Sequence, residues 1–253
     1  MTVPEDSSGA TDLVLRPAVA DDVARLVEVY LAAATGEGHP VERRTHQQLV
    51  DWLGERVRSV SADRHEVWVA ADDERVVGFA DVHGDWVSLL FVDPTRQRQG
   101  VGRALLELVQ ALRPGGFGLR VHADNAPARA FYARLGLVEL ERTDGSAYDD
   151  GWPDCRLAWP GHEPLRYWRS TIDEVDAELA VLLARRFALA GAVQDLKAAT
   201  IGAGGEAARD ARREAEIVDR MATLAPSLDR THLERVMRVV LEEGLTAWER
   251  THP

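Results

Sequence analysis

The chain has 253 residues, of which 42 are acidic and 30 are basic, so its formal net charge is −12. Such a length is long for a single core and leaves room for two domains. The negative charge argues against a nucleic acid or an anionic membrane as a partner, so an anionic ligand must be held by a local group of cations. Cys155 is the only cysteine, which excludes an intrachain disulfide and favours the cytoplasm.

Strand and helix signals alternate in the first part of the chain. Met1–Thr11 is acidic and polar, and we expect a disordered tail there rather than a signal peptide. No segment has the length of an uncharged membrane span. Residues 12–160 predict an α/β or α+β domain, with a first helix capped by Asp21 or Asp22. The expected strands are 13–16, 66–71, 75–82, 86–92, 118–122, 138–142 and 155–159, and the expected helices are 23–30, 104–112 and 127–135.

Residues 161–164 predict a linker, because glycine and proline interrupt the periodic pattern there. Residues 165–253 follow as an all-α domain of three helices without strand signals. The first of these helices, from about Leu165 to Ala199, is expected to be about 50 Å long, which is more than the width of a domain of this size. A second copy of the chain is the simplest partner for such a helix, so we predict an intertwined homodimer.

A strand, a glycine-containing turn and a helix start follow one another between Asp93 and Ala104, in the order Gln97-Arg-Gln-Gly100-Val-Gly-Arg-Ala. This arrangement exposes backbone N–H groups at a helix N-terminus, where they can bind a pyrophosphate. Glycines let the backbone approach the phosphates, and the nearby arginines add positive charge. By itself, the pattern also fits a plain connection between a strand and a helix.

A second motif, Asn125-Ala-Pro-Ala-Arg-Ala-Phe-Tyr132-Ala-Arg-Leu-Gly136, lies downstream. Together the two motifs resemble the acetyl-CoA-dependent GNAT N-acetyltransferases over about Leu13–Trp159. The resemblance implies that Asn125 contacts the pantetheine arm and that Tyr132 donates a proton to the leaving thiolate, a tyrosine used only for packing being the alternative. It also implies that backbone N–H groups of the Leu90–Val92 strand stabilise the oxyanion. The residues implied in cofactor binding are Leu90, Val92, Gln97, Arg98, Gly100, Val101, Gly102, Arg103, Ala104 and Asn125.

The general base and the acceptor amine are not evident from the sequence. Many members of the superfamily carry a glutamate on the strand before the turn, whereas this strand offers only Asp85 and Ser88. A base that acts through water, or an amine that arrives neutral, remains open. The segment from Thr35 to Arg44 is expected to border the acceptor pocket, and no metal is expected.

An apolar seam with a seven-residue repeat runs along the first helix of the second domain, and Arg186 interrupts it. A charge in a buried seam is costly unless it meets a counter-ion. Lys197, the only lysine, faces the same interior, whereas Arg169 points elsewhere, toward a neighbouring protomer. The second helix carries further inward charges, at Asp210, Arg213 and Glu214. Either Arg186 forms an internal salt bridge with Asp210 or Glu214, or the cations bind an anionic ligand.

These spacings resemble the all-helical, AroQ-type chorismate mutases over about Leu165–Glu249. The resemblance implies a unimolecular rearrangement of chorismate to prephenate, which needs no nucleophile. The protein holds a dicarboxylate in a compact conformation and stabilises the negative charge that grows on the ether oxygen. Arg186 and the partner's Arg169 are implied to bind carboxylates, and Lys197 to bind a carboxylate and the ether oxygen.

Further residues of this site are implied on the second and third helices. Arg213 is implied to order the cations, and Glu214 with the Asp210 region to bind the ring hydroxyl. The sequence departs from the family at Gly244 and Trp248, where a serine and a glutamine or glutamate are usual. Either the mutase activity is lost, or the Trp248 indole N–H replaces the missing donor and an altered substrate, such as an amino-substituted chorismate, is used.

The sequence therefore predicts a bifunctional enzyme that acetylates a small amine and rearranges chorismate or an amino-substituted chorismate. One alternative is an acetyltransferase whose helical domain only dimerises or senses a metabolite. A second alternative is that both halves are binding modules.

Overall fold

The computed structural model describes residues 13–34, 43–58, 65–143, 152–201, 211–225 and 228–251. The expected tail, most of the Thr35–Arg44 segment and Asp210 lie outside these residues. The chain divides into two compact units, Met1–Tyr167 and Trp168–Pro253.

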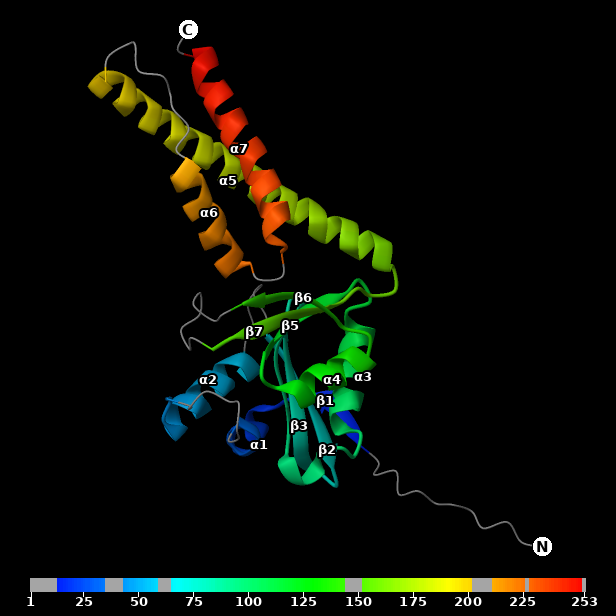
Figure 1. Cartoon of the computed structure of the whole chain (residues 1–253). Helices are drawn as coiled ribbons and strands as arrows, with labels where there is room; N and C mark the ends of the chain where they lie inside the picture. Colours follow the sequence, from blue (N-terminus) through cyan, green and yellow to red (C-terminus); the bar gives the residue numbers. More distant parts are fainter. Residues whose placement is uncertain are drawn as a thin grey trace, which may run out of the picture. The chain divides into compact units, whose positions relative to one another are not determined.

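The first unit is built on a single seven-stranded sheet (Figure 1). The strand order is β1-β2-β3-β4-β5-β7-β6, and the one parallel pair is β4 with β5. The strands are β1 (Val14–Pro17), β2 (His65–Asp72), β3 (Arg75–His83), β4 (Trp86–Val92), β5 (Phe117–His122), β6 (Val138–Thr143) and β7 (Asp154–Trp159).

Helices cover both faces of this sheet (Figure 1). On one face, α1 (Val23–Ala34) and α2 (His46–Arg58) enclose a core built around Phe79, and a short 3₁₀ turn, η1 (Ala20–Asp22), precedes α1. On the other face, α3 (Val101–Leu112) and α4 (Ala126–Arg134) cover a second core. Both faces of the central strands are therefore buried, which explains why their sequences read as continuous apolar runs rather than as strict alternation.

The structure reproduces the expected strands to within about two residues and adds a helix that the pattern did not suggest. Asp73 and Glu74 both adopt positive φ, 45° and 68°, as a tight hairpin turn between β2 and β3 requires. Helix α3 begins at Val101, three residues before the expected start. Helix α2 was not expected, because only Leu49 and Leu53 of its large apolar side chains are buried.

The sheet opens between β4 and β5. These strands pair only at Trp86↔Gly118 and Val87↔Leu119, so they separate toward their carboxyl ends. Beside this opening, the register between β3 and β4 shifts: Asp81 pairs with Leu89 and Val82 with Val87, which leaves Ser88 as the extra residue of a bulge. An opened sheet edge beside a bulge leaves backbone groups available to a ligand.

The expected linker is packed against the first unit. The His162 N–H donates to Pro114 O at 3.0 Å, and the backbone of Gly161, at φ +69°, lies against Gly115. The Tyr167 ring lies over Gly116, where a Cβ would come within 2.5 Å of it. Residues 161–167, including the first turn of α5, therefore belong to the first unit.

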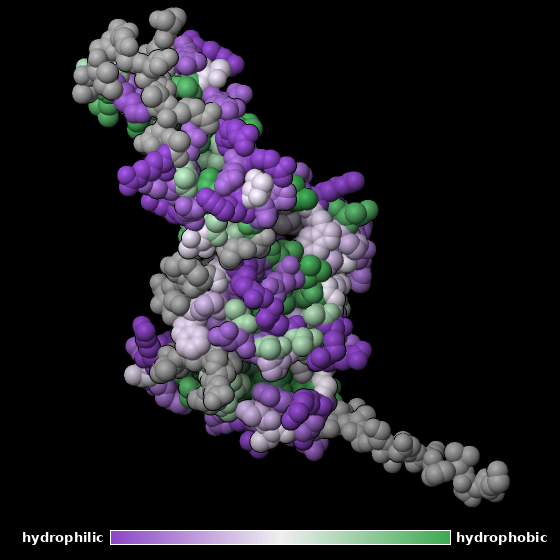
Figure 2. All heavy atoms as spheres, viewed as in Figure 1, coloured by the Kyte–Doolittle hydropathy of each residue, from purple (hydrophilic) through white to green (hydrophobic). Residues whose placement is uncertain are grey.

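The second unit contains α5 (Pro164–Ile201), α6 (Ala211–Leu224) and α7 (Arg230–Thr251), as the absence of strand signals predicted. Helices α6 and α7 share a small core of Val218, Leu233 and Met237. The apolar seam of α5 is not covered, since its seven aliphatic residues are 48–69% exposed. These residues are Ile172, Val175, Leu179, Leu182, Leu189, Val193 and Leu196. Hydrophobic side chains are also visible as green patches on the helical unit in Figure 2.

None of the helices in the described part of the chain combines the length and the apolar character needed to cross a membrane.

Candidate functional site

The turn before α3 presents free backbone donors. Gly100 is the residue before the helix and has φ +90°, a conformation that favours glycine. The first intrahelical bond is donated by the Ala104 N–H to Gly100 O at 2.9 Å. The N–H groups of Val101, Gly102 and Arg103 therefore have no acceptor within the helix, and they point outward at its positive end.

Gly102 is not required by packing. A Cβ at this position would lie 3.5 Å from both Phe131 and Val92, which is an ordinary van der Waals distance. Its φ is also not in the left-handed region. A glycine that neither packing nor conformation demands indicates that something outside the protein approaches the backbone closely.

Hydrogen bonds around Asp93 hold the turn in place. Asp93 accepts from the backbone N–H of Thr95 at 3.0 Å and from its hydroxyl at 2.7 Å, and it forms an ion pair with Arg25 of α1. The hydroxyl bond, and then the other donors, lower the pKa of Asp93 despite its burial. Asp93 therefore stays charged and fixes the start of the turn.

The side chains of the turn play different parts. Arg98 has φ +59°, an uncommon backbone conformation for a residue with a Cβ. Arg103 forms an ion pair with Glu107 at 2.7 Å, so its guanidinium lies along the helix rather than over the turn. The Gln97 side-chain amide donates to Val92 O at 3.4 Å and links the turn to the end of β4.

The edge of β4 that faces β5 carries the second group of donors. The Asp93 N–H donates to Val77 O of β3 at 2.9 Å. Because backbone groups alternate along a strand, the N–H groups of Leu90 and Val92 face the other way, into the opening between β4 and β5. Two donors of one strand thus point to the side where β4 and β5 no longer pair, and the Val92 side chain lies close to Gly102 at the start of α3.

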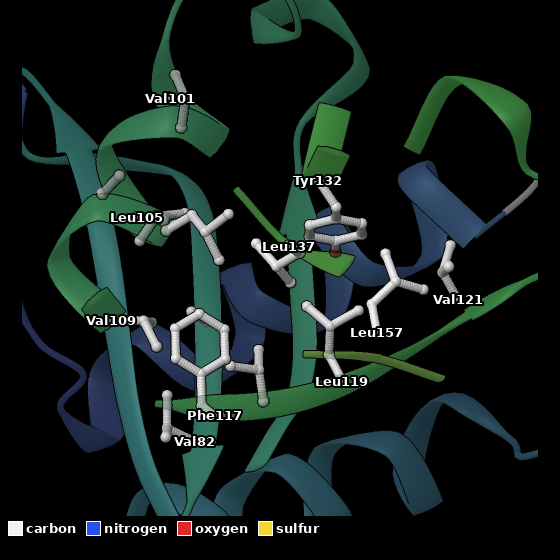
Figure 3. Close-up of a cluster of buried hydrophobic side chains, with 14 of the residues drawn as sticks. Val82, Val101, Leu105, Val109, Phe117, Leu119, Val121, Tyr132, Leu137 and Leu157 are labelled. Carbon is white, nitrogen blue, oxygen red and sulfur yellow. The ribbon is translucent and has the colours of Figure 1, made fainter. Parts of the chain in front are cut away.

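Asn125 and Tyr132 lie at opposite ends of the short helix α4. The Asn125 carbonyl oxygen caps the helix by accepting the Ala128 N–H at 3.0 Å, which leaves its NH₂ group for a ligand. Tyr132 is buried in the core between the sheet and α3, and its ring lies beside Leu137 (Figure 3). Burial raises the pKa of Tyr132 to about 12. The phenol therefore stays protonated at any ordinary pH.

In the helical unit, Arg186 lies against the position that departs from the family. Its Nη1 atom is buried and has no hydrogen-bond partner in the described residues. A Cβ at Gly244 would lie 3.9 Å from this atom and 3.2 Å from the Phe187 ring. Arg186 Nη1 thus lies beside Gly244 without a carboxylate partner among the described residues, and Asp210, one of its two expected partners, lies outside them.

The Trp248 indole is not a free donor in this structure. Its Nε1 donates to the Asp195 carboxylate on α5 at 2.6 Å. The Trp248 N–H could therefore replace the missing glutamine only after its hydrogen bond to Asp195 is broken. The two residues are 53 positions apart, so the sequence pattern gave no indication of their contact.

The remaining residues expected at the helical site are not brought together within one chain. Arg169 and Lys197 are exposed on α5, and Arg213 forms an ion pair with Glu216 at 3.3 Å. Glu214 is half-buried on α6. The apolar seam beside Lys197 is also exposed.

Comparison with known proteins agrees with this geometry. Residues 63–139 match the sequence family described as Acetyltransferase (GNAT) domain, and residues 168–247 match Chorismate mutase type II. The [Ribosomal protein bS18]-alanine N-acetyltransferase of Escherichia coli strain K12 is 36% identical over 107 residues, which cover 39% of this chain and 71% of that protein. The chain belongs to the GNAT acetyltransferases. Its helical unit carries a chorismate mutase type II domain, so both expected resemblances are confirmed.

Other relatives of this GNAT protein match its first unit. The peptidyl-lysine N-acetyltransferase YiaC of E. coli strain K12 is 29% identical over 150 residues, 58% of this chain and 97% of that protein. A solved structure of YncA from Salmonella typhimurium with its cofactor acetyl-CoA is 18% identical, with a TM-score of 0.47 over 58% of this chain and 92% of that one.

The structure also shows a polar cluster that the sequence analysis missed, on the face covered by α1 and α2. Asp81 is fully buried on β3, and both of its oxygens lie within 3.0 Å of His65 Nδ1 on β2. Arg56 of α2 donates to the same carboxylate at 3.1 Å. His83 stacks on His65 with the ring centroids 4.9 Å apart.

A signal for this cluster was present in the sequence. An aspartate interrupts the otherwise apolar strand Val77–Val82, and a carboxylate in such a position must find a partner. The hairpin register then places Val67 opposite Asp81 and His65 opposite His83, which brings His65 within reach of the carboxylate. By contrast, Asp85 lies in the turn before β4 and Ser88 at the bulge, and neither forms such a dyad.

Proposed function

We propose that the chain is a bifunctional enzyme: an acetyl-CoA-dependent N-acetyltransferase of a small amine, fused to a dimeric mutase that rearranges chorismate or an amino-substituted chorismate. One observation carries the first activity. The free amides at the N-terminus of α3 and those of Leu90 and Val92 on the open edge of β4 lie along one path, which fits a pyrophosphate followed by an extended thioester arm.

The acetyl group is supplied as a thioester, and the protein's residues would act on both sides of it. The amides from Arg98 to Ala104 hold the pyrophosphate, and the Asn125 NH₂ group contacts the arm. The Leu90 and Val92 N–H groups stabilise the negative charge on the carbonyl oxygen while the amine nitrogen bonds to the carbonyl carbon. As the carbon–sulfur bond breaks, Tyr132 gives its proton to the thiolate.

The proton of the attacking amine needs an acceptor, and His65 is the best-placed group for it. Asp81 accepts a hydrogen bond from His65 Nδ1, which selects the tautomer with an unprotonated Nε2. The dyad lies on the face opposite α3 and α4. Asp81 lies beside the bulge of β4, and His65 is in the row of Trp86 and Gly118, the last point at which β4 and β5 pair. With the cofactor entering from the side of α3, the amine would approach from the side of His65.

Binding of acetyl-CoA can be tested separately from catalysis at Gly102. In Gly102→Asp, a carboxylate would replace the open backbone where the phosphates are held, and we expect the Kd for acetyl-CoA to rise at least about 100-fold. An acidic residue in the first turn of a helix is otherwise favourable, so the melting temperature should not fall. Isothermal titration calorimetry measures the affinity. Gly115→Asp, where a Cβ meets only open space, is the matched control.

The role of Tyr132 can be tested with Tyr132→Phe. We expect kcat for acetyl transfer to fall about 10- to 100-fold, because the thiolate then leaves without a proton donor. With the folded pKa at about 12 and the unfolded pKa near 10, the native phenol stabilises the fold below pH 10 and loses this contribution as the pH rises to 12. The wild type should therefore lose about 2–3 kcal/mol more unfolding free energy than the phenylalanine variant over that range. Equal kcat values would remove the acid role.

The second activity is supported by the cations of α5 and by the uncovered seam around them. A second chain packed on the seam would bury the aliphatic residues and bring the partner's Arg169 toward Arg186 and Lys197. Arg186 and the partner's Arg169 would bind the two carboxylates, with Lys197 also at the ether oxygen. Arg213, Glu214 and the Asp210 region would complete the site.

A non-catalytic helical domain is the second candidate, favoured by one observation. Trp248 is engaged by Asp195 instead of being free to donate to the ether oxygen. On that alternative the domain dimerises the enzyme or senses a metabolite, and the intact protein consumes neither chorismate nor its amino-substituted analogue. Consumption of either compound by the native chain excludes it.

A further inference from the structure

Two arginines on adjacent strands face each other beside the opening of the sheet. Arg120 of β5 and Arg156 of β7 are directly opposite in the antiparallel register. Their guanidinium carbons lie 5.9 and 5.7 Å from the centre of the Trp86 ring on β4. Gly118 makes room for this ring, since a Cβ there would come within 2.5 Å of it. The three side chains therefore form one group, which we name the Trp86 platform.

The Trp86 platform lies on the same face as the His65–Asp81 dyad. Val87, Leu119 and Leu157 are buried in the core on the side of α3 and α4. Because side chains alternate along a strand, their neighbours in sequence, the residues of the platform, point to the opposite face. His65, His83, Trp86 and Gly118 are also in one cross-strand row. The platform thus adjoins the place where the amine would approach.

Among the described residues, only one of the two arginines of the platform is paired with a carboxylate. Asp154 accepts from Arg120 at 3.1 and 3.2 Å and from Thr143 at 2.9 Å, so this carboxylate is already engaged. In the described part of the chain, Arg156 has no ion pair, and its buried Nε lacks a hydrogen-bond partner. Glu141 lies opposite Arg156 on β6, but the guanidinium leans the other way, over Trp86.

Such an arrangement reduces stability without a ligand. Like charges directly opposite each other on a sheet are destabilising, and a buried donor without an acceptor loses its hydration. A ligand carboxylate bound to Arg156 would offset the repulsion between the two arginines and would accept a hydrogen bond from the unpaired N–H. The Trp86 indole would pack against the apolar part of the same ligand. We infer that the Trp86 platform binds the carboxylate of the acceptor, so that the acetyltransferase acts on a small amine that carries a carboxylate and an apolar body. This inference rests on the proposed acetyl transfer and specifies its substrate class.

The first test measures binding without chemistry, on the full chain. Benzoate and benzamide share an apolar ring, but only benzoate is an anion. We expect calorimetry to show benzoate binding at least about tenfold more tightly than benzamide, with this preference lost in Arg156→Gln. Arg142→Gln is the matched control, because that arginine lies on β6 in an ion pair with Glu139. It should keep the preference. Equal affinities for the two compounds in the wild type would overturn the inference.

The second test uses acetyl transfer to paired acceptors, L-phenylalanine with L-phenylalaninamide and 4-aminophenylacetate with 4-aminophenylacetamide. The wild type should prefer the acid of at least one pair by about tenfold or more in kcat/KM, and Arg156→Gln should remove this preference through KM. The Kd for acetyl-CoA should not rise and the melting temperature should not fall, since the variant removes the repulsion between Arg156 and Arg120. Transfer without any preference for the acid contradicts the inference but leaves the acetyltransferase standing. Benzoate binding without transfer to any amine contradicts the acetyltransferase but leaves the anion site.

Discussion

Replacing His65 with glutamine is expected to lower kcat for acetyl transfer by about 100- to 1,000-fold at neutral pH, while the Kd for acetyl-CoA stays within about twofold. Glutamine can still donate a hydrogen bond to Asp81, but it cannot accept the proton of the attacking amine. The loss should therefore fall on kcat rather than on cofactor binding. Stopped-flow detection of the released thiol, with an amine that the wild type acetylates, measures it.

The pH profile separates a base from a merely structural residue. In the wild type, the imidazole can take up the proton of the attacking amine. In His65→Gln only amine that has lost its proton in solution can react, so the rate should rise about tenfold per pH unit below the pKa of the amine. The groups that face the His65 ring, His83, Asp81 and Arg56, are present in both proteins.

Two further variants define the roles within the dyad. Asp81→Asn should lower kcat less than His65→Gln, because it removes the group that orients the imidazole but leaves the imidazole itself. His83→Gln is the matched control, since its ring stacks on His65 while the carboxylate bonds go to His65. If His83→Gln lost as much kcat as His65→Gln, or if His65→Gln kept the wild-type pH profile, His65 would not be the base.

The turn at Gly100 could be predicted from the sequence because its determinants are local. All of them lie within about a dozen neighbouring residues. They are the positive φ of Gly100 before the helix, the glycine at 102 that packing does not require, and the apolar strand that precedes the turn. Local backbone preferences act on the same scale, so the pattern and the structure agree. The hairpin turn at Asp73 and Glu74 was predictable for the same reason.

The dyad and the Trp86 platform depend on register, which the local pattern does not give. His65 meets Asp81 only through the pairing of β2 with β3, and Arg156 meets Trp86 only because β7 lies beside β5 in the sheet. Helix α2, which supplies Arg56, buries too few apolar residues to show a clear period. Contacts that depend on which strands pair in the sheet cannot be predicted from a single sequence.

Trp248 illustrates the same limit in the helical unit. From the sequence, either the mutase activity is lost at this position or the indole N–H of Trp248 replaces the missing donor. In the structure this N–H donates a hydrogen bond to Asp195, a residue to which the sequence pattern assigns no role. The missing information was a contact between two helices, α5 and α7, whose facing residues cannot be derived from the period of either helix alone.

Replacing Lys197 with alanine is expected to lower kcat for the rearrangement of chorismate, or of its amino-substituted analogue, by about 100- to 1,000-fold. Acetyl transfer should be unchanged. The negative charge on the ether oxygen grows only in the transition state, so a cation placed there acts mainly on kcat. Lys197 is exposed on the single chain and makes no ion pair in the described residues, so its loss should not unfold the domain. Absorbance of the substrate reports turnover.

The same experiment distinguishes a shared site from one confined to a single chain. Leu182 is 59% exposed in the middle of the seam. If the chain dimerises there as proposed, Leu182→Glu should give a monomer and stop the rearrangement as well. Ala184→Glu, on the other side of the same helix, should leave both unchanged. Sedimentation velocity gives the oligomeric state. A monomeric Leu182→Glu that still turns over substrate would show that the partner's Arg169 is not needed. If the native chain is a dimer but does not turn over chorismate or its analogue, the role of α5 is dimerisation. The cations of the seam then have no catalytic role.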